Sequence, residues 1–292
     1  MEEHNETPIQ EQPERKIKLW PPKREWLYNA AIVLCIAVFA VSAFLLGRWL
    51  YENHKTKKLA GQLQDMVGIS ESTVTEDGVE VLPPAEDEDL MLSEMSFDQL
   101  MMENPDTVGW IRVAGTNVNY PIVQATDNEY YLKRDFYHKF TNAGWIYGDY
   151  RNNFWDLQSN KNLIIYGHCR LDMSMFGSLE YCRRAWWVNN PGYHTIHIST
   201  PTETTVWKVF AVYTTDVDFY YIKTNFSSDT DFLNLVEEMK SRSIHDFGTA
   251  VNGDDTILTL STCSTDADRL VVNAVLVKSE PTAQESIPVP TE

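Results

Sequence analysis

The sequence predicts a mostly β protein: a closed barrel of seven or eight short strands with peripheral helices, preceded by one N-terminal transmembrane helix. Two observations predict this fold class. An uncharged apolar run lies near the N-terminus, and from residue 96 onward short alternating runs follow one another with turn residues between them. Strands this short and frequent are typical of an antiparallel or mixed barrel rather than of a parallel α/β sheet.

The apolar run Leu27–Gly47 carries no charged side chain over 21 residues, which is enough for a helix that crosses a membrane. A cleaved signal peptide is the alternative, but such peptides have a shorter apolar stretch after a brief basic start. We expect residues 1–26 to be a cytoplasmic segment and residues 27–50 an uncleaved, single-pass anchor in the cell membrane. Basic residues are slightly more frequent before the run than after it, which favours an N-terminus inside the cell and an extracytoplasmic domain.

The net charge of −18 is uneven, because residues 59–96 hold ten acidic residues and no basic one. Such a segment buries too little apolar surface to offset the entropy lost on ordering. We therefore expect residues 51–95 to form a solvated acidic linker. The remaining domain is also acidic and has no basic stripe, which argues against a nucleic-acid partner.

A metal or cofactor site is not predicted. His194 and His197 are three residues apart, and in an extended segment this spacing directs them to opposite faces. We interpret them as surface imidazoles rather than as zinc ligands.

The domain from residue 96 to residue 278 begins with a short amphipathic helix near Ser96, which ends at Asn104-Pro105 and is followed by a strand at Gly109–Val113. Further strands are expected in the runs VNYPIVQ, AGWIYGDY, NLIIYGH, HTIHIST, TTVWKVFAVYTT, DTILTLST and RLVVNAVLV. One helix, Asp229–Arg242, interrupts the late strands, with Ser228 or Asp229 as its cap. Residues 279–292 are proline-rich and polar, which predicts a disordered tail.

Three residues at predicted strand ends could form a catalytic site. His168 closes the strand NLIIYGH, Cys263 falls where a strand stops, and Arg269 opens the next strand. A cysteine nucleophile needs a group that moves protons and a donor for the developing oxyanion. Each residue also has a plainer interpretation, as a hydrogen-bonded surface imidazole, a small core thiol and a surface ion-pair partner, respectively.

Three cysteines lie beyond the predicted anchor: Cys169, Cys182 and Cys263. An odd number leaves at least one thiol free unless chains are cross-linked. A disulfide between Cys169 and Cys182 would leave Cys263 free, but sequence spacing gives no geometry with which to decide. Because successive strand residues point to opposite faces, we do not expect Cys169 to act as a second nucleophile beside His168.

The chain resembles the class B sortases, which are membrane-anchored cysteine transpeptidases of Gram-positive cell surfaces. The resemblance covers most of residues 96–278. It is carried by NPDTVGWIRV, VNYPIVQATDNEYYL, AGWIYGDYRN, NLIIYGH, the late helix, and TLSTC followed by RLVV. The order of histidine before cysteine differs from that of papain-like proteases, in which the cysteine comes first. A sortase-like, eight-stranded β-barrel is the fold that the resemblance implies.

The resemblance also implies roles for individual residues. Cys263 matches the nucleophile, His168 the general acid and base, and Arg269 the guanidinium that helps to bind the peptide and stabilises the oxyanion. The positions that match the peptide groove, or flank the thiol beside it, are Asn128, Leu132, Tyr221, Ile222, Ser261 and Thr262.

The reaction implied by the resemblance is cleavage of a C-terminal sorting signal through a thioacyl enzyme, followed by acyl transfer to an amine of a peptidoglycan precursor or of a pilin. No cofactor is implied. Two other classes of function stay open on the residues alone. One is a membrane-anchored peptide-binding module without catalysis, and the other is an exported cysteine hydrolase that transfers the acyl group to water.

Overall fold

The computed structural model describes residues 25–69, 73–84, 94–216, 218–263 and 268–282. The chain divides into two units, residues 1–50 and residues 51–292. Helix α1 (Glu25–Met66) contributes its first part to the first unit and its last part to the second. It is long and apolar enough to cross a membrane, and none of its apolar stretch is buried. This helix matches the predicted span and favours a membrane anchor, while its orientation stays a prediction.

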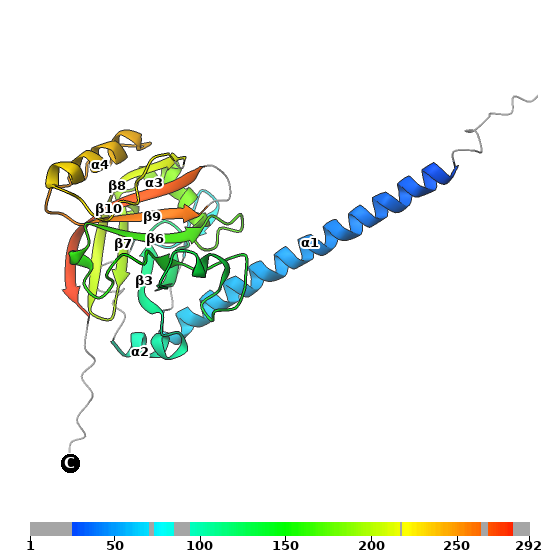
Figure 1. Cartoon of the computed structure of the whole chain (residues 1–292), viewed down its shortest axis with the longest axis horizontal. Helices are drawn as coiled ribbons and strands as arrows, with labels where there is room; N and C mark the ends of the chain where they lie inside the picture. Colours follow the sequence, from blue (N-terminus) through cyan, green and yellow to red (C-terminus); the bar gives the residue numbers. More distant parts are fainter. Residues whose placement is uncertain (1–24, 70–72, 85–93, 217, 264–267, 283–292) are drawn as a thin grey trace, which may run out of the picture. The chain divides into compact units, whose positions relative to one another are not determined.

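The second unit contains a closed barrel with the strand order β10-β8-β7-β3-β4-β5-β6-β9. The strands are β3 (Thr107–Val113), β4 (Asn119–Val123), β5 (Tyr147–Gly148), β6 (Asn162–His168), β7 (Thr195–Ser199), β8 (Glu203–Thr215), β9 (Ile257–Cys263) and β10 (Arg269–Pro281). Neighbours are antiparallel except for the pairs β4–β5 and β6–β9, which are parallel. The predicted eight-stranded barrel is confirmed (Figure 1).

Few helices accompany the barrel: α2 (Glu94–Glu103), α3 (Ala185–Val188) and α4 (Asp229–Arg242), with the 3-10 turns η2 (Tyr130–Lys133), η3 (Leu157–Ser159), η4 (Gly177–Arg183) and η5 (Pro191–Tyr193). Helix α4 has the predicted bounds. The hydroxyl of Ser228 accepts a hydrogen bond from the amide of Asp231 at 3.1 Å, so Ser228 is its N-cap.

The strands bury residues on both faces, which produces two apolar clusters. Along β10, Leu270 and Val272 belong to the barrel core, while Val271 and Val275 belong to a second cluster outside the barrel. This alternation is the period of two expected for a strand. The second cluster includes the buried face of α4, which lies outside the barrel strands (Figure 1).

The predicted acidic linker is wrong for much of residues 51–84. Leu59, Ala60 and Leu63 of α1 are buried in the main core, because residues three and four apart share one helix face even in an acidic segment. An antiparallel hairpin follows, formed by β1 (Val74–Glu76) and β2 (Val79–Val81). Residues 85–93 of the predicted linker lie outside the described residues.

The predicted disordered tail is wrong for residues 279–282. Strand β10 continues to Pro281, and Thr282 donates a hydrogen bond from its hydroxyl to the carbonyl of Thr200 at 2.7 Å. The rest of the predicted tail, residues 283–292, lies outside the described residues.

The two histidines predicted to be surface imidazoles are buried. His197 lies on β7, between β3 and β8. The Nε2 of His194 donates to the carbonyl of Val188 at 3.0 Å, and its ring contacts Phe247. Burial lowers the pKa of His194, the carbonyl hydrogen bonds opposing this. Residue spacing along a strand does not indicate which other elements cover it, and here those elements bury both imidazoles.

The cysteines outside α1 are not bridged where the structure describes them. Cys169 is exposed and Cys182 is fully buried, and both are free thiols. Among the described residues, no group of three or more His, Cys, Asp or Glu side chains could hold a metal ion.

Candidate active site

The parallel pair β6 and β9 brings the predicted histidine and cysteine together. Their register runs from Asn162 opposite Ile257 to His168 opposite Cys263, the last pair of both strands. Adjacent strands lie about 4.8 Å apart, so the two backbones are immediate neighbours. The side chain of Cys263 lies outside the described residues.

Arg269 reaches the same edge of the sheet from the other side of β9. Strand β10 is antiparallel to β9, with Val271 opposite Ser261. Arg269 is the first residue of β10, two residues before this pair, and Cys263 is the last residue of β9, two residues after it. The amide of Leu270 donates to the Thr262 hydroxyl at 2.9 Å, which ties the start of β10 to the end of β9. The loop 264–267 between them lies outside the described residues.

The imidazole of His168 is oriented by the η2 segment. Its Nε2 lies 2.7 Å from the carbonyl oxygen of Leu132. Since a carbonyl can only accept, Nε2 is the nitrogen that carries the proton in this contact. Gly144 has a φ of +59°, and a Cβ at this position would lie 2.7 Å from Cδ2 of His168. A glycine is therefore required both for the backbone conformation and for the space beside the ring.

The predicted groove residues have different degrees of exposure. Leu132, Ile222 and Asn128 are partly buried, and the side-chain amide of Asn128 donates a hydrogen bond to Asp149. Tyr221 is buried, and its hydroxyl forms a 2.8 Å hydrogen bond with that of Ser261. Ser261 and Thr262 are each 1% exposed. Their hydroxyls contact protein groups, so direct contact of these two residues with a peptide stays a prediction.

Comparison with known proteins decides the family. A Sortase domain matches residues 111–277. Sortase B of Listeria monocytogenes is 34% identical over 259 residues, which cover 87% of this chain and 98% of that protein. The chain belongs to the sortase family, class B. Sortases are cysteine transpeptidases, and the chain is therefore an enzyme of this class.

Solved sortase structures agree in fold. Sortase B from Bacillus anthracis, solved in complex with AAEK1, superimposes with a TM-score of 0.65 at 34% identity, covering 78% of this chain and 99% of that one. The Staphylococcus aureus sortase B–substrate complex has a TM-score of 0.63 at 30% identity, covering 78% and 97% of the two chains.

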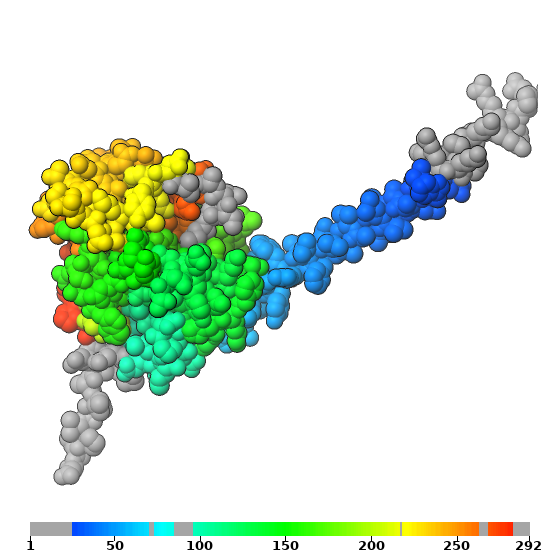
Figure 2. Space-filling model, viewed as in Figure 1, coloured from blue at the N-terminus to red at the C-terminus, as the bar shows by residue number. Residues whose placement is uncertain are grey.

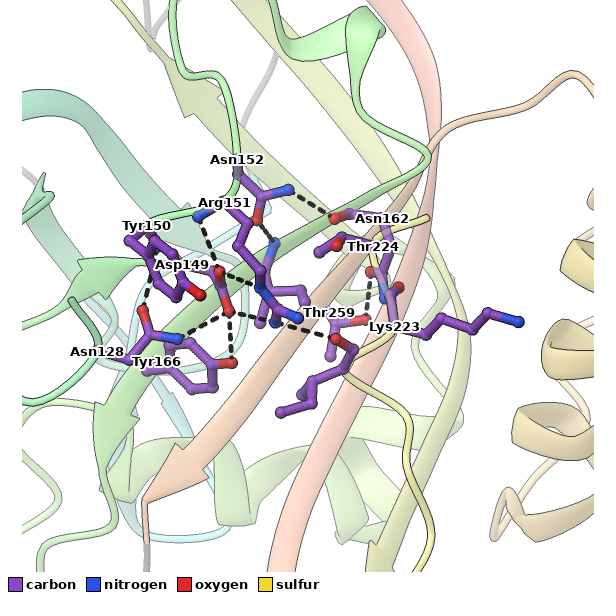
Figure 3. A network of polar contacts seen from close by, with 12 residues as sticks. Asn128, Asp149, Tyr150, Arg151, Asn152, Asn162, Tyr166, Lys223, Thr224 and Thr259 are labelled. Atoms are coloured by element: carbon purple, nitrogen blue, oxygen red, sulfur yellow. Dashed lines mark hydrogen bonds and ion pairs between the residues drawn. The ribbon is translucent and has the colours of Figure 1, made fainter. Parts of the chain in front are cut away.

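An ion pair between buried Asp149 and the partly exposed Arg151 has no counterpart in the sequence-based site prediction of this sortase. Asp149 is fully buried and accepts hydrogen bonds from Arg151 Nε at 2.7 Å and Nη2 at 2.6 Å. Tyr166 and Asn128 donate to the same carboxylate at 2.9 and 3.0 Å (Figure 3). The only sequence signal was the motif GDYRN, in which the acid and the base are two residues apart.

The protonation of this pair follows from its contacts. Burial by itself would raise the pKa of Asp149, but hydrogen bonds from Arg151 and Tyr166 outweigh it and hold the pKa below its usual range. The hydrogen bond to Asp149 raises the pKa of Arg151. Both side chains of this sortase are therefore charged at neutral pH.

Proposed function

We propose that the enzyme cleaves a C-terminal sorting signal of surface proteins through a thioacyl intermediate on Cys263 and transfers the acyl group to an amine. The amine belongs to a peptidoglycan precursor or to a pilin. The register pair of His168 and Cys263 at the ends of β6 and β9 is the observation that carries this proposal. Staphylococcus aureus sortase B, 30% identical to this chain, was solved as a substrate complex, which supports substrate binding by this domain.

In the first half of the reaction, the Cys263 thiolate attacks the scissile carbonyl carbon. The carbon–nitrogen bond then breaks, and His168 donates a proton to the departing amine. Because the Leu132 carbonyl holds the proton on Nε2, Nδ1 is the nitrogen that exchanges protons with the reacting groups. Arg269 supplies the donor that stabilises the negative oxygen of the tetrahedral intermediate.

In the second half, the acceptor amine attacks the thioester carbonyl and gives its proton to His168. The carbon–sulfur bond breaks and the thiolate returns. Anchoring by α1 with the N-terminus inside the cell would keep the domain outside, beside acceptors and substrates that are themselves held at the membrane. This arrangement raises their effective concentration.

The test uses purified enzyme, a panel of sorting peptides and an added amine, with mass spectrometry of protein and products. Cys263→Ala is expected to lower transfer by at least about 1,000-fold and to abolish the acyl adduct, because it removes the nucleophile. Cys169→Ala is the matched control, since it removes the neighbouring exposed thiol. Turnover that survives in Cys263→Ala would disprove the assignment.

The partner residues are tested in the same assay. His168→Ala is expected to abolish turnover as well. Arg269→Ala is expected to lower kcat about 100-fold, as for loss of one oxyanion donor, and Arg269→Lys to retain part of the activity. Full activity in both arginine variants would assign the oxyanion contact to another group.

The same products separate the two alternative functions. A hydrolase would give free acid whether or not the amine is present. A non-catalytic binding module would bind peptide without forming a thioester on Cys263.

A further inference from the structure

The segment Tyr220–Lys223, which includes two predicted groove residues, has no regular secondary structure. It follows β8 and leads into α4. In the space-filling view it lies in the yellow region, against the green residues that connect β5 and β6 (Figure 2). Its position therefore depends on contacts made by side chains of the barrel.

Three consecutive carbonyls of this segment accept hydrogen bonds from Asn162 on β6 and from Arg151 in the connection between β5 and β6. Asn162 Nδ2 donates to the carbonyls of Tyr221 at 3.2 Å and Lys223 at 2.9 Å. Arg151 Nη2 donates to the carbonyl of Ile222 at 3.0 Å, and Arg151 Nη1 donates to the hydroxyl of Tyr220 at 3.3 Å. Because these donors contact consecutive carbonyls, they restrict both the distance of the segment from the barrel and its rotation about its own backbone.

Arg151 itself is held in one orientation by Asp149. The two-point contact between guanidinium and carboxylate fixes the plane of the arginine, and a lysine cannot reproduce it. The carboxylate is in turn held by Tyr166, two residues before His168 on β6, and by Asn128, which is itself a predicted groove residue (Figure 3). The ion pair thus connects Asn128, β6 and the segment Tyr220–Lys223.

We propose that Arg151, oriented by Asp149, is a positioning residue that places Tyr221 and Ile222 for peptide binding. The inference rests on the proposed function, since it assigns these residues to the groove of that reaction. It predicts an effect on peptide affinity and not on the reactivity of the thiol.

The test compares Arg151→Lys with the wild-type enzyme, and with Arg183→Lys as the matched control from a surface arginine–glutamate pair. In Arg151→Lys we expect KM for the sorting peptide to rise about tenfold, as for one lost hydrogen bond to a charged group. We expect kcat and the alkylation rate of Cys263 by iodoacetamide to change by less than about twofold, because the chemistry is untouched. The control is expected to leave all three values unchanged.

Hydrogen exchange gives a readout that does not need turnover. Amides within residues 219–226 are expected to exchange faster in Arg151→Lys, with exchange in β6 and β9 unchanged. Asp149→Asn, which keeps the shape of the side chain, is expected to reproduce both effects. Unchanged exchange in the segment, unchanged KM, or equal losses in kcat and alkylation would overturn the proposal.

Failure of the proposed function is distinguishable from failure of this inference. If the wild-type enzyme formed no thioacyl adduct with any peptide, the function would fail, while faster exchange confined to residues 219–226 would still support positioning by Arg151. If the adduct formed normally and neither exchange nor KM responded, only the inference would fail.

Discussion

The segment Tyr220–Lys223 and helix α4 are neighbours in the chain, but they are attached to the barrel by different forces. The segment is held by hydrogen bonds from Arg151 and Asn162 to its carbonyls, in addition to the packing of the Tyr221 ring in the second cluster. Helix α4 is held by buried apolar side chains that belong to the second cluster, namely Phe232, Val236 and Met239.

The two kinds of contact contribute differently: hydrogen bonds mainly fix the position of a segment, and apolar burial mainly stabilises the fold. A hydrogen bond is directional. Its net contribution to the free energy of folding is only about 1 kcal/mol, because the donor and the acceptor lose their hydrogen bonds to water when it forms. Apolar burial has little directionality but contributes about 25 cal/mol per Å² removed from water. The hydrogen bonds to the segment are therefore suited to set the position of groove atoms, whereas the apolar packing of α4 is suited to keep that part of the chain folded.

The largest loss of stability is expected for a substitution in the apolar packing of α4. Phe232→Ala should lower the free energy of unfolding by about 3–5 kcal/mol, because it leaves a cavity where a fully buried ring was. Urea denaturation measures the change, and Asn234→Ala on the exposed face of α4 is the control. A loss as small as that of the control would contradict the assignment of α4 as the stabilising element.

A smaller effect is expected where the two kinds of contact meet. Tyr221 contributes its ring to the second cluster and its hydroxyl to Ser261. Tyr221→Phe keeps the ring, so the free energy of unfolding should fall by only about 1 kcal/mol. A double-mutant cycle with Ser261→Ala should give a coupling of similar size, and additive losses would show that the hydroxyl contact contributes nothing.

The smallest effect is expected at the ion pair that joins the segment to α4. Both carboxylate oxygens of Asp231 lie 2.7 Å from Nζ of Lys223. This hydrogen bond, together with the amide of Ser227, lowers the pKa of Asp231 to about 2. A depressed pKa in the folded state means that the contribution is complete above the usual pKa of about 4 and is lost as the pH falls toward 2.

Stability measured by urea at several pH values tests this sign. Asp231→Asn should flatten the loss of stability between about pH 4 and pH 2. Glu237→Gln, at an exposed position of the same helix, should leave the slope as in the wild type. A slope in Asp231→Asn equal to that of the wild type would show that this pair does not respond to pH in the folded protein.

Local pattern was sufficient for most of the barrel, while the roles of the candidate site residues stay predictions. The strands closed by His168 and opened by Arg269 lie where alternation predicts them, and α4 starts at the predicted cap Ser228. The solvated linker was wrong because average charge hides which residues share a helix face, as Leu59 and Leu63 do. The surface histidines were wrong because coverage by neighbouring elements is not a local property.

By itself, the sequence determined the strand content, the apolar span and the residues able to do cysteine chemistry, because these depend on residue type and on periods of two or 3.6. Only the tertiary structure decided that His168 is the register partner of Cys263, that Leu132 contributes a carbonyl to the imidazole, and that Arg151 pairs with the buried carboxylate of Asp149. The first two contacts join segments far apart in the chain through barrel closure, and the carboxylate of the local Asp149–Arg151 pair is also held by Asn128, which is distant in sequence; no local pattern encodes these contacts.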